Sequence, residues 1–121
     1  MEIKSKLSVG IKTSFIALHC YPEAPNAVSF LRDMHRHVFH VNLETEVSHD
    51  DRDIEFILLK EDIDKFISSR LKLREWPDNV SCEMIATDIG NYILENYKVN
   101  WVKVLISEDD ENYAVVELER C

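Results

Sequence analysis

The sequence has few glycines, prolines and cysteines, and no long run of apolar residues. Two glycines and three prolines occur in 121 residues, so no stretch has the composition of a flexible linker. The three cysteines are far apart and form no Cys-x-x-Cys pair, which indicates neither a disulfide framework nor a cysteine zinc site. No apolar run approaches the ~18–20 residues that a membrane span requires, and the N-terminus lacks the apolar region of a signal peptide. We therefore expect a protein of a reducing cytoplasm that does not bind membranes.

Positively charged residues are also scarce. The chain has 14 Lys and Arg residues against 23 Asp and Glu residues, a formal net charge of −9. Because nucleic-acid binders need positive surfaces, this balance argues against general nucleic-acid binding. A small basic cluster is interpreted as a solvated helix end, with a local anion contact as the alternative: Lys65, Arg70, Lys72 and Arg74. Apolar residues make up 45% of the chain, enough for one core, so we expect residues 1–121 to form a single domain.

Alternation of apolar and polar residues predicts the strands of a sheet. The clearest strand covers 34–47, which has one apolar and one polar face. Its apolar face comprises Phe39, Val41, Leu43, Thr45 and Val47. Residues 3–19 are rich in β-forming residues and predict a long strand or hairpin arm. Two short β-rich runs, 100–106 and 112–118, flank an acidic turn and predict a C-terminal hairpin.

Two segments have the apolar spacing of helices. Residues 57–73 carry an apolar stripe, and residues 81–97 repeat isoleucine every fourth position behind Ser81, a favourable N-cap. Residues 21–29 contain two prolines and predict a loop, whereas 53–56 are interpreted as a short strand. The order β-β-α-α-β-β predicts an α+β fold, with a four-stranded antiparallel sheet and two helices on one of its faces.

The histidines are the most informative residues for function. His35 and His37 are two positions apart on a predicted strand, so their side chains project from the same face. His19 lies at the end of the preceding strand, where an antiparallel neighbour would place it opposite the pair. Three neutral imidazoles with one open position form the ligand set of a catalytic zinc site. The pattern therefore predicts a metal site at His19, His35 and His37.

A lone His-x-His pair on a strand is more often a pair of surface residues or of core residues with satisfied hydrogen bonds. Two features favour a metal site here. The pair shares the apolar face of its strand with Phe39 and Val41, where an imidazole without a metal would need a buried partner. A third histidine is also within reach. We expect His40, on the opposite face, and His49, in a turn, to take no part.

Six segments match a known family in their order: FIALHC, MHRHVFHVNLETEV, DIEFILLKEDI, SCEMIATDIGNYI, WVKVLIS and YAVVELE. Together they cover nearly the whole chain and resemble the 6-pyruvoyl-tetrahydropterin synthase family, which includes the bacterial 6-carboxytetrahydropterin synthases. The resemblance implies the tunnelling fold (T-fold) of that family. It also implies that His19, His35 and His37 bind Zn, because family members carry a strand-end histidine followed by a His-Gly-His-type pair that together bind zinc.

The chain departs from the family pattern at the residues that catalyse the family reaction. The family's catalytic cysteine stands four residues before the histidine pair, where this chain has Leu31. Arg36 replaces the glycine within the pair, and no histidine follows His49 to complete the family's Asp-His couple. The family's pterin-anchoring glutamate aligns with Ile106. Glu108, two residues later on the same strand face, is the candidate to bind the ligand instead.

Other side chains are candidates to replace the missing cysteine. Cys82 lies near a predicted helix N-terminus, where the helix dipole would lower its thiol pKa; the alternative is a small buried helix residue. Glu23 and Asp33 are candidate bases or else solvated loop carboxylates. Cys20 would point away from the neighbouring histidine on a regular strand. We take Glu108 and Cys82 as the candidate ligand-binding residues and assign no catalytic residue.

Two classes of function follow from these residues and the resemblance. The first is a zinc-dependent lyase-type enzyme that acts on a pterin or a purine-derived small molecule, with zinc polarising an oxygen while a base moves protons. The second is a catalytically inactive family member that binds or sequesters a pterin- or nucleotide-like ligand. A purely structural subunit is a third possibility. The resemblance also implies a homo-oligomer, a trimer or hexamer in which the sheets of several subunits close a ring and hide their edges.

Overall fold

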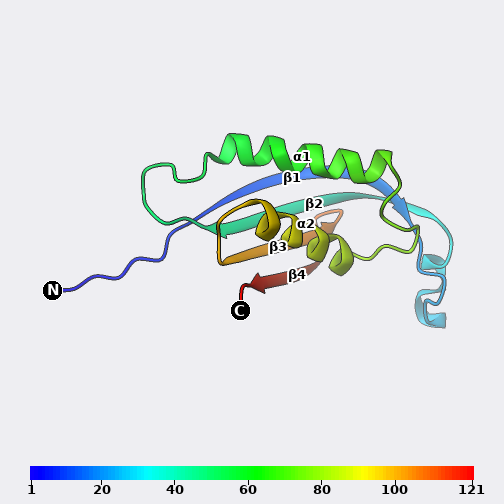
Figure 1. Ribbon diagram of the computed structural model, residues 1–121. Helices are drawn as coiled ribbons and strands as arrows, with labels where there is room; N and C mark the ends of the chain where they lie inside the picture. Colours follow the sequence, from blue (N-terminus) through cyan, green and yellow to red (C-terminus); the bar gives the residue numbers. More distant parts are fainter.

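The computed structural model describes residues 1–121, which form one sheet and two main helices (Figure 1). The strands are β1 (Ser8–His19), β2 (His35–Glu46), β3 (Trp101–Glu108) and β4 (Asn112–Glu119). They pair antiparallel in the order β1-β2-β3-β4. The helices are α1 (Phe56–Lys72), α2 (Cys82–Asn96) and a short 3-10 helix, η1 (Asn26–Leu31). The predicted α+β fold and its β-β-α-α-β-β order are confirmed.

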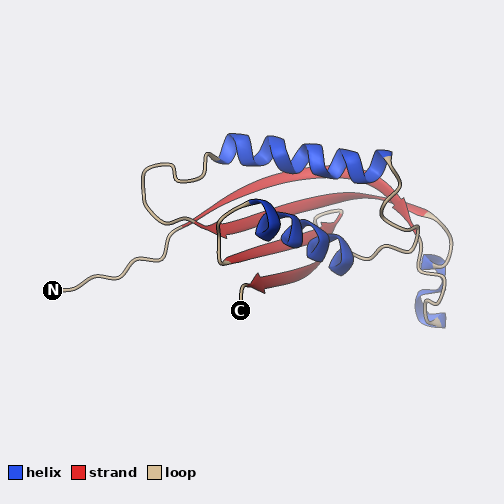
Figure 2. Cartoon of the chain, in the orientation of Figure 1, coloured by secondary structure: helices blue, strands red, loops and turns tan.

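Both main helices cover the same face of the sheet, and the opposite face is bare (Figure 2). Helix α1 packs on β1, while α2 packs on β3 and β4. The core lies between the two layers, and its fully buried side chains include Phe39, Val41, Leu43, Leu59, Ile63, Ile85, Ile89, Ile93, Val104 and Ile106. None of the helices is both long enough and apolar enough to cross a bilayer.

Local sequence explains why the two central elements of the site form where they do. In β2, the residues on the predicted apolar face are buried from Phe39 to Thr45, and Thr45 satisfies its hydroxyl by donating to the Trp101 carbonyl at 2.9 Å. Helix α2 begins after Ser81, whose side-chain oxygen accepts a hydrogen bond from the Met84 amide at 3.1 Å. This is the predicted N-cap, which satisfies a free amide of the first turn and fixes where α2 begins.

The element boundaries differ from the sequence predictions in three places. Strand β1 begins at Ser8, which pairs with Glu46 at the end of β2, and not at residue 3 as predicted. Beyond this pair, the Leu7 carbonyl accepts one more hydrogen bond, from the Val47 amide at 3.0 Å. Residues 53–56 form no strand, because the Glu55 carboxylate accepts from the Ile57 amide at 3.0 Å and caps α1. The predicted loop at 21–29 contains the start of η1.

The functional end of the sheet is where β1 ends and β2 begins. The antiparallel register places His19 directly opposite His35, and Ala17 opposite His37. The prediction that His19 lies opposite the histidine pair is therefore confirmed. The connection between the helices joins this end too, since the Cys20 amide donates to the Asp78 carbonyl at 2.8 Å.

Candidate metal centre

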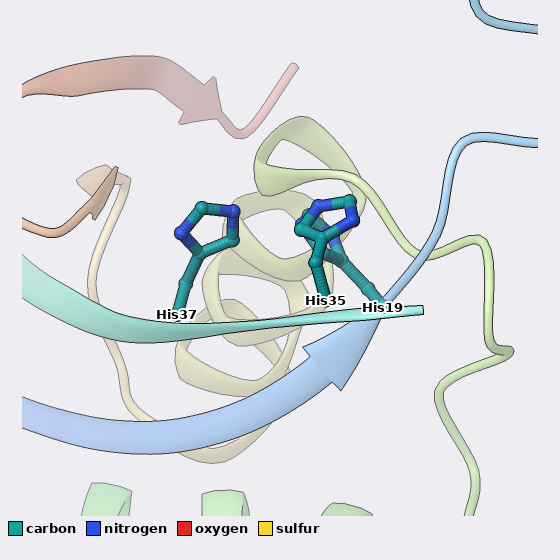
Figure 3. Close-up of side chains that lie close together, drawn as sticks. All are labelled: His19, His35 and His37. Carbon is teal, nitrogen blue, oxygen red and sulfur yellow. The ribbon is translucent and has the colours of Figure 1, made fainter. Parts of the chain in front are cut away.

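The side chains of His19, His35 and His37 converge on the helix-covered face of the sheet. All three rings extend to the same side of β1 and β2 (Figure 3). One nitrogen from each ring lies within 4.8 Å of the other two, and the ring centroids are 4.5–5.2 Å apart. His19 is buried, with 7% of its surface exposed, and the other two are half-buried. This cluster could hold a metal ion.

Backbone carbonyls orient two of the three rings. The Nδ1 atom of His19 is 2.8 Å from the Val80 carbonyl oxygen, and the Nδ1 atom of His35 is 2.8 Å from the Asp33 carbonyl oxygen. Because a carbonyl oxygen only accepts hydrogen bonds, both Nδ1 atoms must carry the proton. In a neutral imidazole this leaves the lone pair on Nε2, which is the form that binds a metal.

Asp109 orients the third ring. Its Oδ2 atom is 2.5 Å from the Nδ1 atom of His37, and its Oδ1 atom accepts from the Val38 amide at 3.0 Å. These two hydrogen bonds, that of His37 above all, lower the pKa of Asp109 below its ordinary value of 3.8. Asp109 is therefore an ionised acceptor, and in a neutral imidazole its hydrogen bond places the proton on Nδ1 and the lone pair on the Nε2 atom of His37. A carboxylate behind a histidine is a common support for a metal ligand.

The sequence interpretation did not find Asp109, because residues 108 and 109 of a regular strand would face opposite ways. The chain departs from that alternation at Asp109, whose φ is +53°. This left-handed conformation, together with a hydrogen bond from the Asp109 amide to the Val38 carbonyl at 2.8 Å, turns the carboxylate back toward His37. Aspartate tolerates that conformation better than most residues. The only signal in the sequence was an acidic turn.

The ring nitrogens that face away from these hydrogen bonds provide the test of whether a metal fits. The Nε2 atoms of His19 and His37 are buried and have no hydrogen-bond partner. Leaving such an atom unpaired costs about 1–3 kcal/mol, and native proteins rarely do so. A metal ion held by the three Nε2 atoms would satisfy both. Since nitrogens around a tetrahedral zinc ion lie ~3.3 Å apart, the rings would draw together to bind one.

A cavity of about 640 Å³ opens beside the histidines. This volume lies within the ~300–1,000 Å³ range of small-molecule sites. The first turn of α2 forms one wall, and the segment after β1 forms another. The lining includes His19, His35, Glu108, Cys82, Ser81, Glu83, Cys20, Tyr21, Glu23 and Leu31. A ligand in this cavity would lie against His19 and His35, two of the three histidines.

Glu108, predicted to bind the ligand, lies at the edge of the histidine cluster. Its Oε1 atom is 3.3 Å from the Nε2 atom of His19, and its Oε2 atom is 3.4 Å from the Nε2 atom of His37. The sheet register explains this position, since Glu108 pairs with Phe39, two residues after His37 on the same face. The structure thus brings Glu108 together with the three histidines.

Cys82, the other predicted ligand-binding residue, also lines the cavity, but its thiol is not activated. Its Sγ atom is 3.7 Å from the Oε1 atom of Glu108, and its side chain packs in the core. Burial, aided by the Glu108 carboxylate, raises the pKa of Cys82 to about 12. Of the two interpretations of Cys82, the thiol activated by the helix dipole does not hold, because desolvation and a nearby negative charge both disfavour the thiolate. Cys82 is a small buried helix residue.

The remaining candidates divide between the cavity wall and the surface. Glu23 lines the cavity and is exposed, whereas Asp33 reaches the site through its carbonyl oxygen. Cys20 also lines the cavity although strand alternation predicts that it points away, because β1 ends one residue earlier. Leu31, where the resemblance would place the family's cysteine, lines the cavity wall. His49 is elsewhere, with its Nε2 atom 3.5 Å from Asp53.

An Asp109→Asn variant is expected to bind zinc about 10- to 100-fold more weakly than the wild type, which is the usual effect of losing an outer partner of a metal ligand. The neutral amide would no longer stabilise a proton on the Nδ1 atom of His37. Competition with a chromogenic chelator measures the affinity. The matched control is Asp110→Asn, since Asp110 shares the turn and a φ of +58°. Equal zinc affinity in Asp109→Asn and the wild type would show that Asp109 does not support the site.

A scan against models of protein families and a comparison with curated proteins find no significant match to this chain. Membership of the 6-pyruvoyl-tetrahydropterin synthase family therefore stays a prediction from the resemblance of the six segments. The antiparallel α+β fold and the histidine cluster are features of the structure itself. A function has to be inferred from the chemistry of that cluster and its cavity.

Proposed function

We propose that this protein is a zinc-dependent member of the 6-pyruvoyl-tetrahydropterin synthase group that acts on a pterin or purine-derived small molecule by lyase-type chemistry. One observation carries the proposal. In His19, His35 and His37 the Nδ1 atom lies next to a hydrogen-bond acceptor, which leaves Nε2 free to bind a metal. The three rings converge beside a cavity of ligand size. That is the donor set of a catalytic zinc site.

Zinc is the metal that the resemblance implies, and three imidazoles with one open position are the ligand set of catalytic zinc sites. Imidazoles also bind other first-row metals, so the histidines by themselves do not select zinc. When bound, it would supply Lewis acidity to a hydroxyl or carbonyl oxygen of the ligand. The protein's own groups would do the rest. Glu108, next to the histidines, would accept and return a proton at the adjacent carbon, and Asp109 would keep His37 in the correct tautomer. The walls of the cavity would orient the ring system of the ligand.

A second function, binding or sequestering the ligand without converting it, is favoured by the state of the cavity's thiol. A pKa of about 12 keeps Cys82 protonated at neutral pH, so it cannot act as a nucleophile or as a ready base. Leu31, at the position of the family's catalytic cysteine, has no proton to transfer. These two residues support a site that retains its metal and cavity while the chemistry of the family is reduced or lost.

We also expect the chain to act as a homo-oligomer, a trimer or hexamer as the resemblance implies. The bare face of the sheet carries large exposed apolar side chains, among them Ile16, Leu18, Tyr113 and Val115. Strands β1 and β4 have no neighbour on their outer edges. Exposed edges and apolar groups of this kind favour association. In a ring, both features would be covered by copies of the same chain.

The test begins with native mass spectrometry of the purified protein, which reports subunit number, zinc content and any retained small molecule together. A dihydropterin is then titrated into the zinc-loaded and the chelator-stripped protein, and products are analysed by mass spectrometry. Zinc-dependent binding with conversion is expected for an enzyme. Zinc-dependent binding with no product would identify the sequestering function. A protein with neither zinc nor dihydropterin binding would contradict both.

A further inference from the structure

We infer that Glu108 is itself a metal ligand, and that its carboxylate occupies the fourth coordination position as long as no small molecule fills the cavity. The inference rests on the proposed metal site. It goes beyond that site because the resemblance implies only the three histidines as metal ligands. The strand-end glutamate of the family binds the pterin and not the metal. Here the glutamate lies two residues farther along the strand, and this shift brings it to the histidines.

The first support is the way in which the Glu108 carboxylate is shared. Each of its oxygens approaches a different ring: Oε1 is 3.3 Å from the Nε2 atom of His19, and Oε2 is 3.4 Å from that of His37. A side chain that anchored a ligand in the cavity would present its oxygens to the open space. Instead, Glu108 directs both oxygens toward the nitrogens that would bind the metal.

The second support is electrostatic. The Nδ1 anchors place the proton of each neutral imidazole away from Glu108, so the lone pairs of Nε2 face a carboxylate that is also rich in electrons. Neither contact is a hydrogen bond, and both Nε2 atoms are buried without a partner. With both rings neutral, this arrangement is repulsive unless a metal cation lies between the groups. A divalent ion would satisfy two imidazoles and the carboxylate at the same time.

The third support is that Glu108 is held in place yet able to leave. Its backbone is fixed at the end of β3, where it pairs with Phe39, and the Cys82 thiol donates to its Oε1 atom at 3.7 Å. Its side chain nevertheless keeps 28% of its surface exposed and lines the cavity. Four protein ligands are typical of a closed zinc site, and three of an open one. A ligand oxygen entering the cavity would displace Glu108 and open the site.

The experiment uses cobalt(II) as the probe, because its visible absorption is stronger in four-coordinate than in five- or six-coordinate sites. Chelator-stripped wild type, Glu108→Gln and Glu108→Asp are titrated with cobalt, and their zinc affinities are measured by chelator competition. Glu111→Gln is the matched control, since Glu111 is an exposed residue of the same turn. His35→Ala reports on the three-histidine site itself. Circular dichroism establishes whether each variant is folded. If Glu108→Gln proves to be unfolded, the result for Glu108→Asp decides the test.

The expected result for Glu108→Gln is a zinc affinity at least about tenfold below that of the wild type, because even the loss of a residue that only supports a metal ligand lowers the affinity by about this factor. The cobalt spectrum should be weaker and shifted. Glu108→Asp should behave similarly, because it keeps the charge but withdraws the carboxylate by one methylene. Wild-type affinity and spectrum in Glu108→Asp or in a folded Glu108→Gln would overturn the inference. If His35→Ala still lost the metal, the proposed function would survive that result. A wild type that bound neither cobalt nor zinc would reject both.

Discussion

A His35→Ala variant is expected to lose its zinc ion while it stays folded. Structural zinc sites with four ligands contribute ~10–16 kcal/mol, so one ligand is worth ~3–4 kcal/mol, or roughly a hundred- to a thousandfold in affinity. His35 is half-buried at the first position of β2, and its side chain is held by one hydrogen bond to the Asp33 carbonyl. Its removal therefore takes little from the core and much from the metal site.

Zinc content after gel filtration measures this effect, and thermal unfolding with added zinc gives an independent readout. A metal at a hundred times its Kd stabilises the wild type by about 2.7 kcal/mol, and His35→Ala should show no such gain. His40→Ala is the matched control, because His40 lies on the same strand with its side chain on the opposite face. A His35→Ala protein with the same zinc content as the wild type would mean that the histidine cluster is not the metal site.

A Phe39→Ala variant is expected to lose about 3–5 kcal/mol of unfolding free energy, the usual cost of truncating a buried phenylalanine. Phe39 is 0% exposed, and its ring stacks on that of Phe15 with centroids 5.1 Å apart. It also supports the site. The ring centroids of His19 and His37 lie 5.2 and 5.9 Å from that of Phe39. The cavity left by truncation would loosen two metal ligands as well as the core.

Urea unfolding of the chelator-stripped protein measures the stability term without the contribution of the metal. Phe30→Ala is the control, because the side chain of Phe30 is 73% exposed and surface truncations usually change stability by less than about 0.5 kcal/mol. We also expect zinc affinity to fall in Phe39→Ala but not in Phe30→Ala. A stability loss below about 1 kcal/mol in Phe39→Ala would contradict the account of the core as a tightly packed support for the histidines.

Periodicity was sufficient to predict the four strands of the sheet, the two main helices, their order and the residues of the histidine cluster, although the short strand predicted at 53–56 does not form. The reason is that alternation along β2 sorts side chains between two faces whatever the rest of the fold does, so His35 and His37 had to share a face with Phe39. Antiparallel pairing of β1 with β2 then brings His19 opposite His35. Both rules depend only on the spacing of residues along the chain, which a single sequence provides.

Asp109 and Cys82 lay beyond those rules for two different physical reasons. Asp109 reaches His37 only because a left-handed residue interrupts strand alternation at the start of the turn after β3, and side-chain patterns do not report such a break. The pKa of Cys82 depends on burial and on the Glu108 carboxylate, which comes from a strand 26 residues away. Sequence spacing identifies side chains that share a face, whereas the packing of distant segments sets their protonation, their partners and therefore their chemistry.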